Sequence, residues 1–206
     1  MVLTMRVGLM GGTMDPIHLG HLLVAEEARQ ALGLEEVVFI PTGQPWMKPD
    51  GVMASGAHRL NMVRLAIGSN PFFRADALEV DRDGPSYTVD TLEALKAGGH
   101  KDDDLHFILG ADLLKDLHEW RDPARMLELC RLVVAPRVGY DDREGSGLGS
   151  LSAGASARTV FLEGPAVGVS STEIRRRAAR GWSIRYMVPE AVVEYIERYG
   201  LYRQEE

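Results

Sequence analysis

Short apolar runs alternate with patterns of helical period along this chain of 206 residues. The runs that are typical of buried strands are Arg6–Met10, Glu36–Pro41, Leu105–Leu109, Arg131–Pro136 and Thr159–Leu162. The helical patterns begin with one from about Leu19 to Gly33 and continue as Ala57–Ile67, Thr88–Ala97, Ser171–Arg180 and Pro189–Tyr199. A glycine follows each helical pattern, where a C-terminal cap would lie. Strands that alternate with helices in this way predict an α/β protein built on a parallel sheet.

Two segments, 42–56 and 137–158, show no periodicity. The first is a candidate lid, and the second, rich in Gly and Ser, is expected to be a surface excursion because the strand pattern resumes at Thr159. We therefore expect a single domain over residues 1–206, with a C-terminal helical portion from about residue 171.

Composition narrows the classes of function. Hydrophobic residues make up 45% of the chain, which is enough for a core, and the net charge of −7 argues against a broad nucleic-acid surface. Cys130 is the single cysteine, so no intrachain disulfide can form, and we expect a buried thiol. The sequence shows neither a secretory leader nor a spanning segment, which predicts a cytoplasmic protein without membrane contact; a homo-oligomer is compatible with it.

The first strand is followed by residues suited to binding a phosphate. We expect the chain to turn sharply at Gly11 and Gly12, ahead of Thr13, at the end of a strand where nucleotides bind in open parallel sheets. A helix then begins near His18 and His21, three residues apart, and unpaired N–H groups at its start attract anions. Two other readings of the histidines are a metal pair or ordinary polar residues, but no further ligand at recognisable spacing accompanies them.

A second helix start carries hydroxyl groups followed by arginines. Ser170 and Glu173 have the spacing of a capping box, and this alone would explain them. Ser171 and Thr172 share one helix face with Arg175, which could meet a phosphate held by the helix N-terminus.

The segment GGTMDPIHLGHL resembles the His-x-Gly-His signature of the nucleotidyltransferase superfamily, and nearly the whole chain is similar to bacterial nicotinate-nucleotide adenylyltransferases. This resemblance implies a Rossmann-like, doubly wound parallel sheet with helices on both faces. It implies adenylyl transfer from ATP to nicotinate mononucleotide, with Mg²⁺ accompanying ATP and no metal held by protein side chains. His18, His21 and Arg175 would then be the catalytic residues.

The resemblance also assigns residues to the ATP end of the site. The segment Ser170–Thr172 would hold the β- and γ-phosphates, and it departs from the family only in Val169, where isoleucine is usual. Asp112, after Gly110, would bind a ribose hydroxyl, although an Asp at a helix start is commonly only a cap. Lys48 would lie near the phosphates, but Met47 stands where many relatives have histidine. Arg137 is either a further phosphate ligand or an exposed loop cation.

At the pyridine end, Trp120 follows a polar run and would stack on the ring, against the general tendency of a tryptophan to pack in a core. The loop Gly84–Thr88 would face the pyridine carboxylate, which would receive the main-chain N–H groups of Val89 and Arg121 and the Thr88 hydroxyl. Trp182 has no such implied role, and we expect it in the core.

Rival functions use parts of the same machinery. Nicotinamide mononucleotide or phosphopantetheine could be the acceptor, and a non-catalytic nucleotide sensor could share the fold. A fragment of a tRNA synthetase would need a Lys-rich loop and a basic surface, against which the acidic balance argues.

Overall fold

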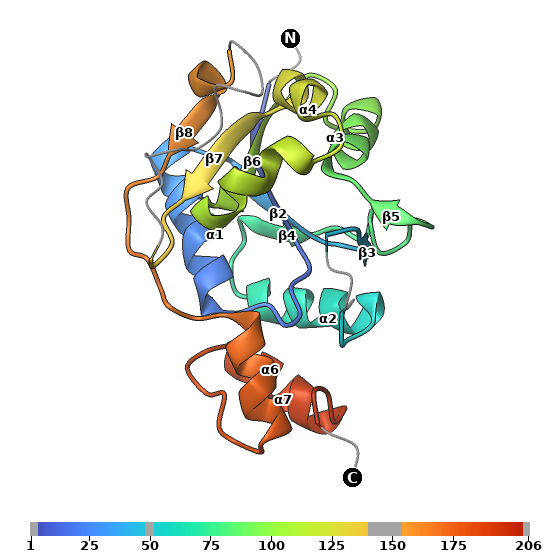
Figure 1. The fold of residues 1–206 in the computed structure, drawn as a ribbon, viewed down its shortest axis with the longest axis vertical. Coiled ribbons are helices and arrows are strands. Elements are labelled where there is room, and N and C mark those ends of the chain that lie inside the picture. The colour runs from blue at the N-terminus through green and yellow to red at the C-terminus, as the bar shows by residue number, and fades with distance from the viewer. Residues whose placement is uncertain (1–3, 48–51, 140–153, 204–206) are drawn as a thin grey trace.

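The computed structural model of the protein describes residues 4–47, 52–139 and 154–203. Six parallel strands form the main sheet. They are β1 (Arg6–Gly12), β2 (Glu36–Pro41), β4 (Phe73–Ala75), β6 (Asp104–Gly110), β7 (Arg131–Ala135) and β8 (Thr159–Phe161). The order across the sheet is β4-β2-β1-β6-β7-β8 (Figure 1). The chain therefore builds outward from β1 in one direction and from β6 in the other, which makes the β1–β6 pair the topological switch point.

Helices cover both faces of this sheet. The helices are α1 (Leu19–Leu32), α2 (Gly56–Ile67), α3 (Thr88–Ala97), α4 (Pro123–Leu129), α6 (Ser171–Ala179) and α7 (Glu190–Arg198), with 3₁₀ helices η1 (Ala111–Glu119) and η2 (Ser156–Arg158). Side chains of α1, α2, α6 and α7 share one core cluster with alternate strand residues, while α3, η1 and α4 share the other. The predicted Rossmann-like doubly wound fold is confirmed.

The strand sequences explain why both faces are covered. In β1, Val7 and Leu9 point into one core cluster and Met10 points into the other, so a run that is apolar at every position buries side chains on both sides. Alternation with polar residues would have left one face to solvent. The sheet is thus enclosed, and ligands can approach only at its edges or at the ends of its strands.

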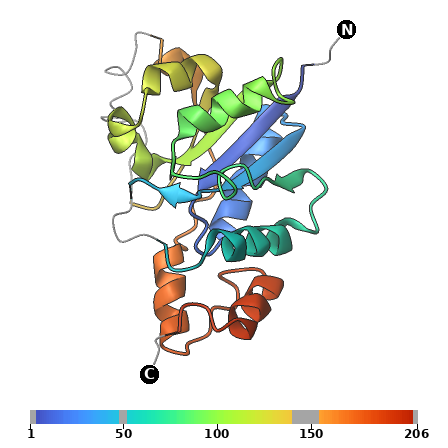
Figure 2. The ribbon, with the colours of Figure 1, turned by 90° about the vertical axis from the view of Figure 1, so that its right-hand side faces the viewer.

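The last two helices lie beyond one end of the sheet, next to α2 (Figure 2). Ile174 of α6 and Val192, Val193 and Ile196 of α7 are buried in the cluster that also contains residues of α1 and α2. In the described ranges, no helix combines the length and apolar character needed to cross a membrane.

The structure corrects several expectations. β1 continues through Gly11 and Gly12, still paired with β2, so the expected sharp turn comes later, at Asp15-Pro16. The strands β4, β3 (Gln44–Pro45) and β5 (Pro85–Ser86), together with η1 and α4, were not predicted. They are too short, or too irregular in period, to give a pattern of their own.

Trp182 is not in the core: it is 52% exposed. Its ring lies under the guanidinium groups of Arg176 and Arg180, at 5.6 and 5.2 Å from the ring centroid. It follows Gly181, which has a left-handed backbone at the end of α6, so the chain has already turned away from the sheet. Stacking of arginines on an exposed ring replaces burial here.

Candidate active site

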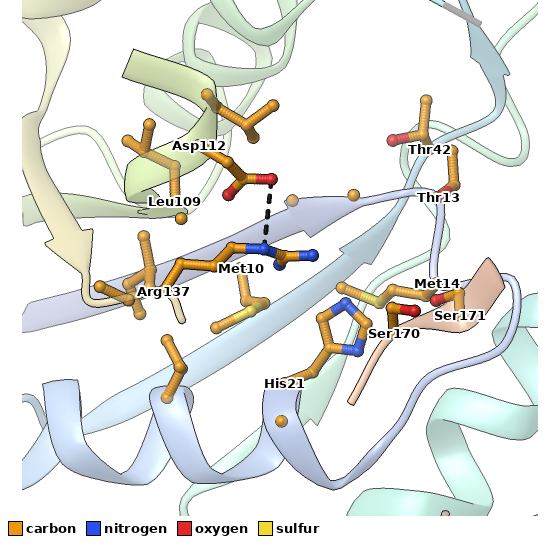
Figure 3. Close-up of a pocket in the computed structure, with 18 of the residues that line it drawn as sticks. Met10, Thr13, Met14, His21, Thr42, Leu109, Asp112, Arg137, Ser170 and Ser171 are labelled. Atoms are coloured by element: carbon orange, nitrogen blue, oxygen red, sulfur yellow. Dashed lines mark ion pairs between the residues drawn. The ribbon is translucent and has the colours of Figure 1, made fainter. Parts of the chain in front are cut away.

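A pocket of about 540 Å³ opens at the carboxyl ends of β1 and β6, at the switch point of the sheet. Met10, Gly11 and Gly12 line it from β1, and Leu109 and Gly110 line it from β6. The first turns of α1 and α6 close the opposite side, so His21 and Ser170, which are far apart in the sequence, lie near each other on one side of the pocket (Figure 3).

Two histidines mark the start of α1 in this pocket. The rings of His18 and His21 are stacked, with centroids 3.8 Å apart and planes inclined by 30°. The backbone N–H of His18 donates to Nδ1 of His21 at 3.2 Å. Because Nδ1 of His21 is an acceptor, a neutral His21 carries its proton on Nε2 and can donate from that atom.

His18 is held in its uncharged form. Its ring is buried, with 5% of the residue exposed, and in the described part of the chain its Nδ1 has no hydrogen-bond partner. Burial, and after it the positive charge of Arg137, lowers the pKa of His18 to about 4. At neutral pH, His18 is therefore a neutral hydrogen-bonding group.

The glycine between the histidines has a steric reason. A Cβ atom at Gly20 would lie 3.0 Å from Nδ1 and 3.1 Å from Cε1 of the His18 ring, closer than ordinary contacts allow. The His18 ring thus packs directly on the backbone of α1. A side chain at this position would force the ring to shift by a few tenths of an ångström, which gives a steric reason for the Gly in the His-x-Gly-His pattern.

The start of α6 faces the same pocket. Ser170 is the N-cap and its hydroxyl accepts from the backbone N–H of Glu173 at 3.2 Å, which confirms half of the expected capping box. The reciprocal half is wrong, since the Glu173 carboxylate binds Arg176 and Arg177 instead. Ser170, Ser171 and Thr172 all line the pocket.

Arg175 lies behind the phosphate loop, by which we mean Gly11–His18. Its Nη1 donates to the backbone carbonyl of Asp15 at 2.7 Å, and its Nη2 lies 3.4 Å from the Thr172 hydroxyl. The Ser171 hydroxyl likewise donates to the carbonyl of Pro16 at 2.9 Å. The two helix starts are thereby joined through one short loop, although Arg175 itself is not among the residues that line the pocket.

An ion pair joins the segments that follow β6 and β7 at the wall of the pocket. Arg137 Nε lies 3.4 Å from a carboxylate oxygen of Asp112, as the dashed line in Figure 3 marks. Both side chains are partly exposed, at 45% for Arg137 and 25% for Asp112. Each group was expected to bind a part of ATP, and both line the pocket, where they now neutralise each other.

The pyridine end of the predicted site is brought together only in part. Thr88 and Trp120 line the pocket, and Trp120 packs edge-to-face on Phe107 with ring centroids 6.0 Å apart. Val89 and Arg121 are not among the lining residues. The Val89 side chain is buried in the core, and the Arg121 guanidinium pairs with Asp90 at 3.1 Å, so only their main chains remain as ligands.

Four other predicted site residues line the pocket as expected, namely Gly11, Gly12, Thr13 and Gly110. Lys48 lies outside the described residues. No group of three or more His, Cys, Asp or Glu side chains able to hold a metal ion occurs within residues 4–47, 52–139 and 154–203.

Four buried polar side chains were missed as functional candidates: Glu79, which lines the pocket, and Asp15, Arg59 and Tyr202 behind it. The carboxylate of Asp15 is buried and accepts from the Met53 and Ala54 N–H groups and from the Tyr202 hydroxyl. A signal existed for Arg59, which stands on the otherwise apolar face of α2 with Met62, Val63 and Ala66. A cation at such a position indicates buried hydrogen-bond partners.

The low pKa of His18 predicts a pH dependence of stability. Between its ordinary pKa of 6.5 and the folded value of about 4, the unfolded chain binds a proton that the folded chain does not. The contribution of His18 is therefore retained above pH 6.5 and is lost as the pH falls toward 4, by roughly 3 kcal/mol in the free energy of unfolding. We expect urea unfolding of His18→Gln to show a shallower fall over this range than the wild type. His118→Gln, on an exposed ring, should follow the wild type; equal slopes for His18→Gln would contradict the assignment.

The fold and this pocket define a nucleotide-binding α/β protein. The Cytidylyltransferase-like family model matches residues 9–177, and the chain belongs to this family. It is 43% identical over 204 residues to a Dehalococcoides mccartyi protein named "Probable nicotinate-nucleotide adenylyltransferase", covering 99% of this chain and 100% of that one. It is 47% identical over 197 residues to a protein of the same name from Roseiflexus sp., covering 96% and 98%.

A solved structure agrees in fold. The Plasmodium falciparum nicotinic acid mononucleotide adenylyltransferase complexed with NaAD superposes with a TM-score of 0.77 at 19% identity, and the match covers 96% of this chain and 97% of that one. The resemblance inferred from the sequence motifs is therefore confirmed by relatives that span the whole chain.

Proposed function

We propose that this protein is a nicotinate-nucleotide adenylyltransferase, which joins nicotinate mononucleotide to the AMP part of ATP and gives nicotinate adenine dinucleotide and pyrophosphate, a step of NAD biosynthesis. The observation that carries the proposal is the convergence of two helix starts, one with a histidine pair and one with three hydroxyl residues, on a single pocket at the switch point. Full-length relatives bear the name of this activity.

The reaction needs no protein nucleophile. A 5′-phosphate oxygen of the mononucleotide attacks the α-phosphorus of ATP, and the bond from that phosphorus to the bridging oxygen of the β-phosphate breaks, so that pyrophosphate leaves. The protein acts by holding the two phosphates in line and by stabilising the charge that develops on them. His18 and His21 are assigned to the α- and β-phosphate region. Ser171, Thr172 and Arg175 are assigned to the leaving pyrophosphate.

The other residues of the predicted site are assigned to the phosphates, the ribose and the pyridine ring. Main-chain atoms of Gly11, Gly12 and Thr13 would approach the phosphates, and Arg137 and Lys48 would add positive charge. Asp112 after Gly110 would accept from a ribose hydroxyl, which requires ligand to share or break the Asp112–Arg137 pair. Trp120 would stack on the pyridine ring, while the Thr88 hydroxyl and the N–H groups of Val89 and Arg121 would receive the carboxylate.

Magnesium would enter with ATP. The metal would be held chiefly by the triphosphate and by water, because Mg²⁺ is usually bound through substrate phosphates with few protein ligands. Bound there, Mg²⁺ would neutralise part of the phosphate charge. The protein residues would then bind and orient the nucleotide.

Pyrophosphate release from ATP and Mg²⁺ tests the function directly. We expect turnover with nicotinate mononucleotide to exceed that with nicotinamide mononucleotide about tenfold or more, because the groups assigned to the carboxylate include the main-chain N–H groups of Val89 and Arg121, and an amide NH₂ would meet another donor there. Phosphopantetheine, run in parallel, should give no release above background. Equal turnover of the two pyridine nucleotides would overturn the carboxylate assignment, and no release with any acceptor would favour a nucleotide sensor.

A further inference from the structure

A buried arginine lies behind the pocket, on the core face of α2. Arg59 is 0% exposed, and its guanidinium donates in three directions. Nη1 binds the carbonyl of Thr13 at 2.7 Å, Nη2 binds the carbonyl of Gly43 at 3.1 Å, and Nε binds the carbonyl of Ala54 at 3.1 Å. A buried charge is unfavourable unless it is hydrogen-bonded, so these three contacts are needed to hold the guanidinium inside the folded protein.

The carbonyls belong to different walls of the pocket. Thr13 is part of the phosphate loop and lines the pocket on the ATP side. Gly43 leads directly into β3, which pairs with β5, and residues of these strands and their flanks, including Pro45, Ser86 and Thr88, line the pyridine end. We call the segments Gly43–Trp46 and Pro85–Thr88 the pyridine wall. One guanidinium therefore binds both the phosphate loop and the pyridine wall.

Buried carboxylates flank Arg59 on the same two sides. Asp15 belongs to the phosphate loop, and Glu79 accepts from the Thr91 hydroxyl at 2.8 Å and also interacts with the Ser86 hydroxyl of β5. The Ser86 hydroxyl in turn accepts from the Gly43 N–H at 3.1 Å. The negative charges of Asp15 and Glu79 act on Arg59 and oppose the effect of burial, which lowers its pKa.

We propose that Arg59 is a positioning residue that fixes the phosphate loop and the pyridine wall relative to each other, and thereby sets the alignment of the acceptor phosphate with the α-phosphorus. This inference rests on the proposed function. Arg59 touches neither substrate, since it is not among the pocket-lining residues and contacts the walls through their backbone carbonyls.

The geometry of the side chain is what matters. An arginine presents donors in a rigid planar fork, whereas a lysine is a point charge on a flexible stem and cannot hold three divergent carbonyls in a fixed arrangement. In-line transfer is sensitive to displacements of about 1 Å between reacting groups. Replacing Arg59 by lysine keeps the charge but removes the planar fork. It should therefore disturb the alignment of the two substrates more than it disturbs folding.

The first test is Arg59→Lys, compared with Arg64→Lys on the exposed face of the same helix. We expect Arg59→Lys to lower kcat about tenfold, to raise KM for both substrates, and to weaken equilibrium binding of ATP alone several-fold. Arg64→Lys should match the wild type. Thermal unfolding of each variant sets an assay temperature at which it is fully folded.

The second test displaces one wall only. A Cβ at Gly43 would lie 2.0 Å from the Glu79 carbonyl oxygen, so Gly43→Ala must shift the backbone at Gly43 or at Glu79 and thereby disturb the pyridine wall. We expect it to raise KM for nicotinate mononucleotide about tenfold and to leave the ATP dissociation constant within about twofold. Gly99→Ala, at an exposed glycine whose Cβ would meet no atom within 4 Å, is the matched control.

The outcomes separate the two proposals. If Arg59→Lys lowers Tm but leaves kcat, KM and ATP affinity unchanged, Arg59 has only a folding role and the inference is overturned. Equal effects of Gly43→Ala on KM for nicotinate mononucleotide and on the ATP dissociation constant would also overturn it. A wild-type protein that binds ATP but does not turn over nicotinate mononucleotide would overturn the proposed function instead. In that case the ATP affinity of Arg59→Lys still decides whether Arg59 positions the phosphate loop.

Discussion

Replacing His18 by alanine should lower kcat on the order of 100-fold while the dissociation constant for ATP stays within about threefold. The imidazole is buried, uncharged at neutral pH and stacked on His21, so its removal deletes one oriented hydrogen-bonding group and the stacking contact of the second ring. A group that acts on charge developing during transfer contributes to kcat more than to ground-state binding. Steady-state kinetics and ATP titration of the same preparation measure the two effects.

The control for this variant is His118→Ala. His118 lies on η1 with 62% of its side chain exposed, so the substitution should leave both parameters unchanged. An intact kcat in His18→Ala, together with weakened ATP binding, would show that His18 serves only to bind the nucleotide.

For Arg175→Ala, we expect kcat/KM for ATP to fall on the order of 100-fold. The variant loses a positive charge near the start of α6, where pyrophosphate is proposed to leave, and it leaves the Asp15 carbonyl without the donor at 2.7 Å that holds the phosphate loop. Arg175→Lys should recover only part of the loss, because lysine cannot reach both the Asp15 carbonyl and the Thr172 hydroxyl with one planar group.

Arg176→Ala supplies the matched comparison. Arg176 is the next residue of the same helix, but its guanidinium pairs with Glu173 and lies over Trp182 at the surface. Measurement of kcat/KM at varied ATP should therefore give a wild-type value for this variant. If Arg175→Ala and Arg176→Ala behaved alike, the proposed role of Arg175 on the phosphates would be wrong.

Much of the fold could be predicted because its signals are local. Every residue between Val7 and Met10 other than Gly8 is apolar, and such runs separated by helical periods indicate an α/β protein with a parallel sheet, whereas the doubly wound order came from the family resemblance. β4 has three residues and β3 has two, too few for any period to be recognised. Trp182 was misplaced because an aromatic residue predicts burial unless stacked cations compensate for its exposure, and the sequence does not show which arginines fold back onto it.

The candidate site divides in the same way. His18, His21 and Ser170–Thr172 could be found because each set lies next to a helix start, within a few residues. The Tyr202–Asp15 hydrogen bond joins residues 187 positions apart, and Arg59 binds carbonyls, which belong to every residue alike. No local pattern encodes such contacts. Arg59 alone gave a partial signal, as a cation on an apolar helix face.

The dependence of Asp15 on distant residues bears on the order of folding. Its carbonyl accepts from Arg175 and its carboxylate accepts from Tyr202, 160 and 187 positions further along the chain. Contacts between residues so far apart in sequence form late, because the entropy of closing a long loop opposes them. The loop between β1 and α1 is therefore expected to reach its final shape only once α6 and the segment that carries Tyr202 have packed against it.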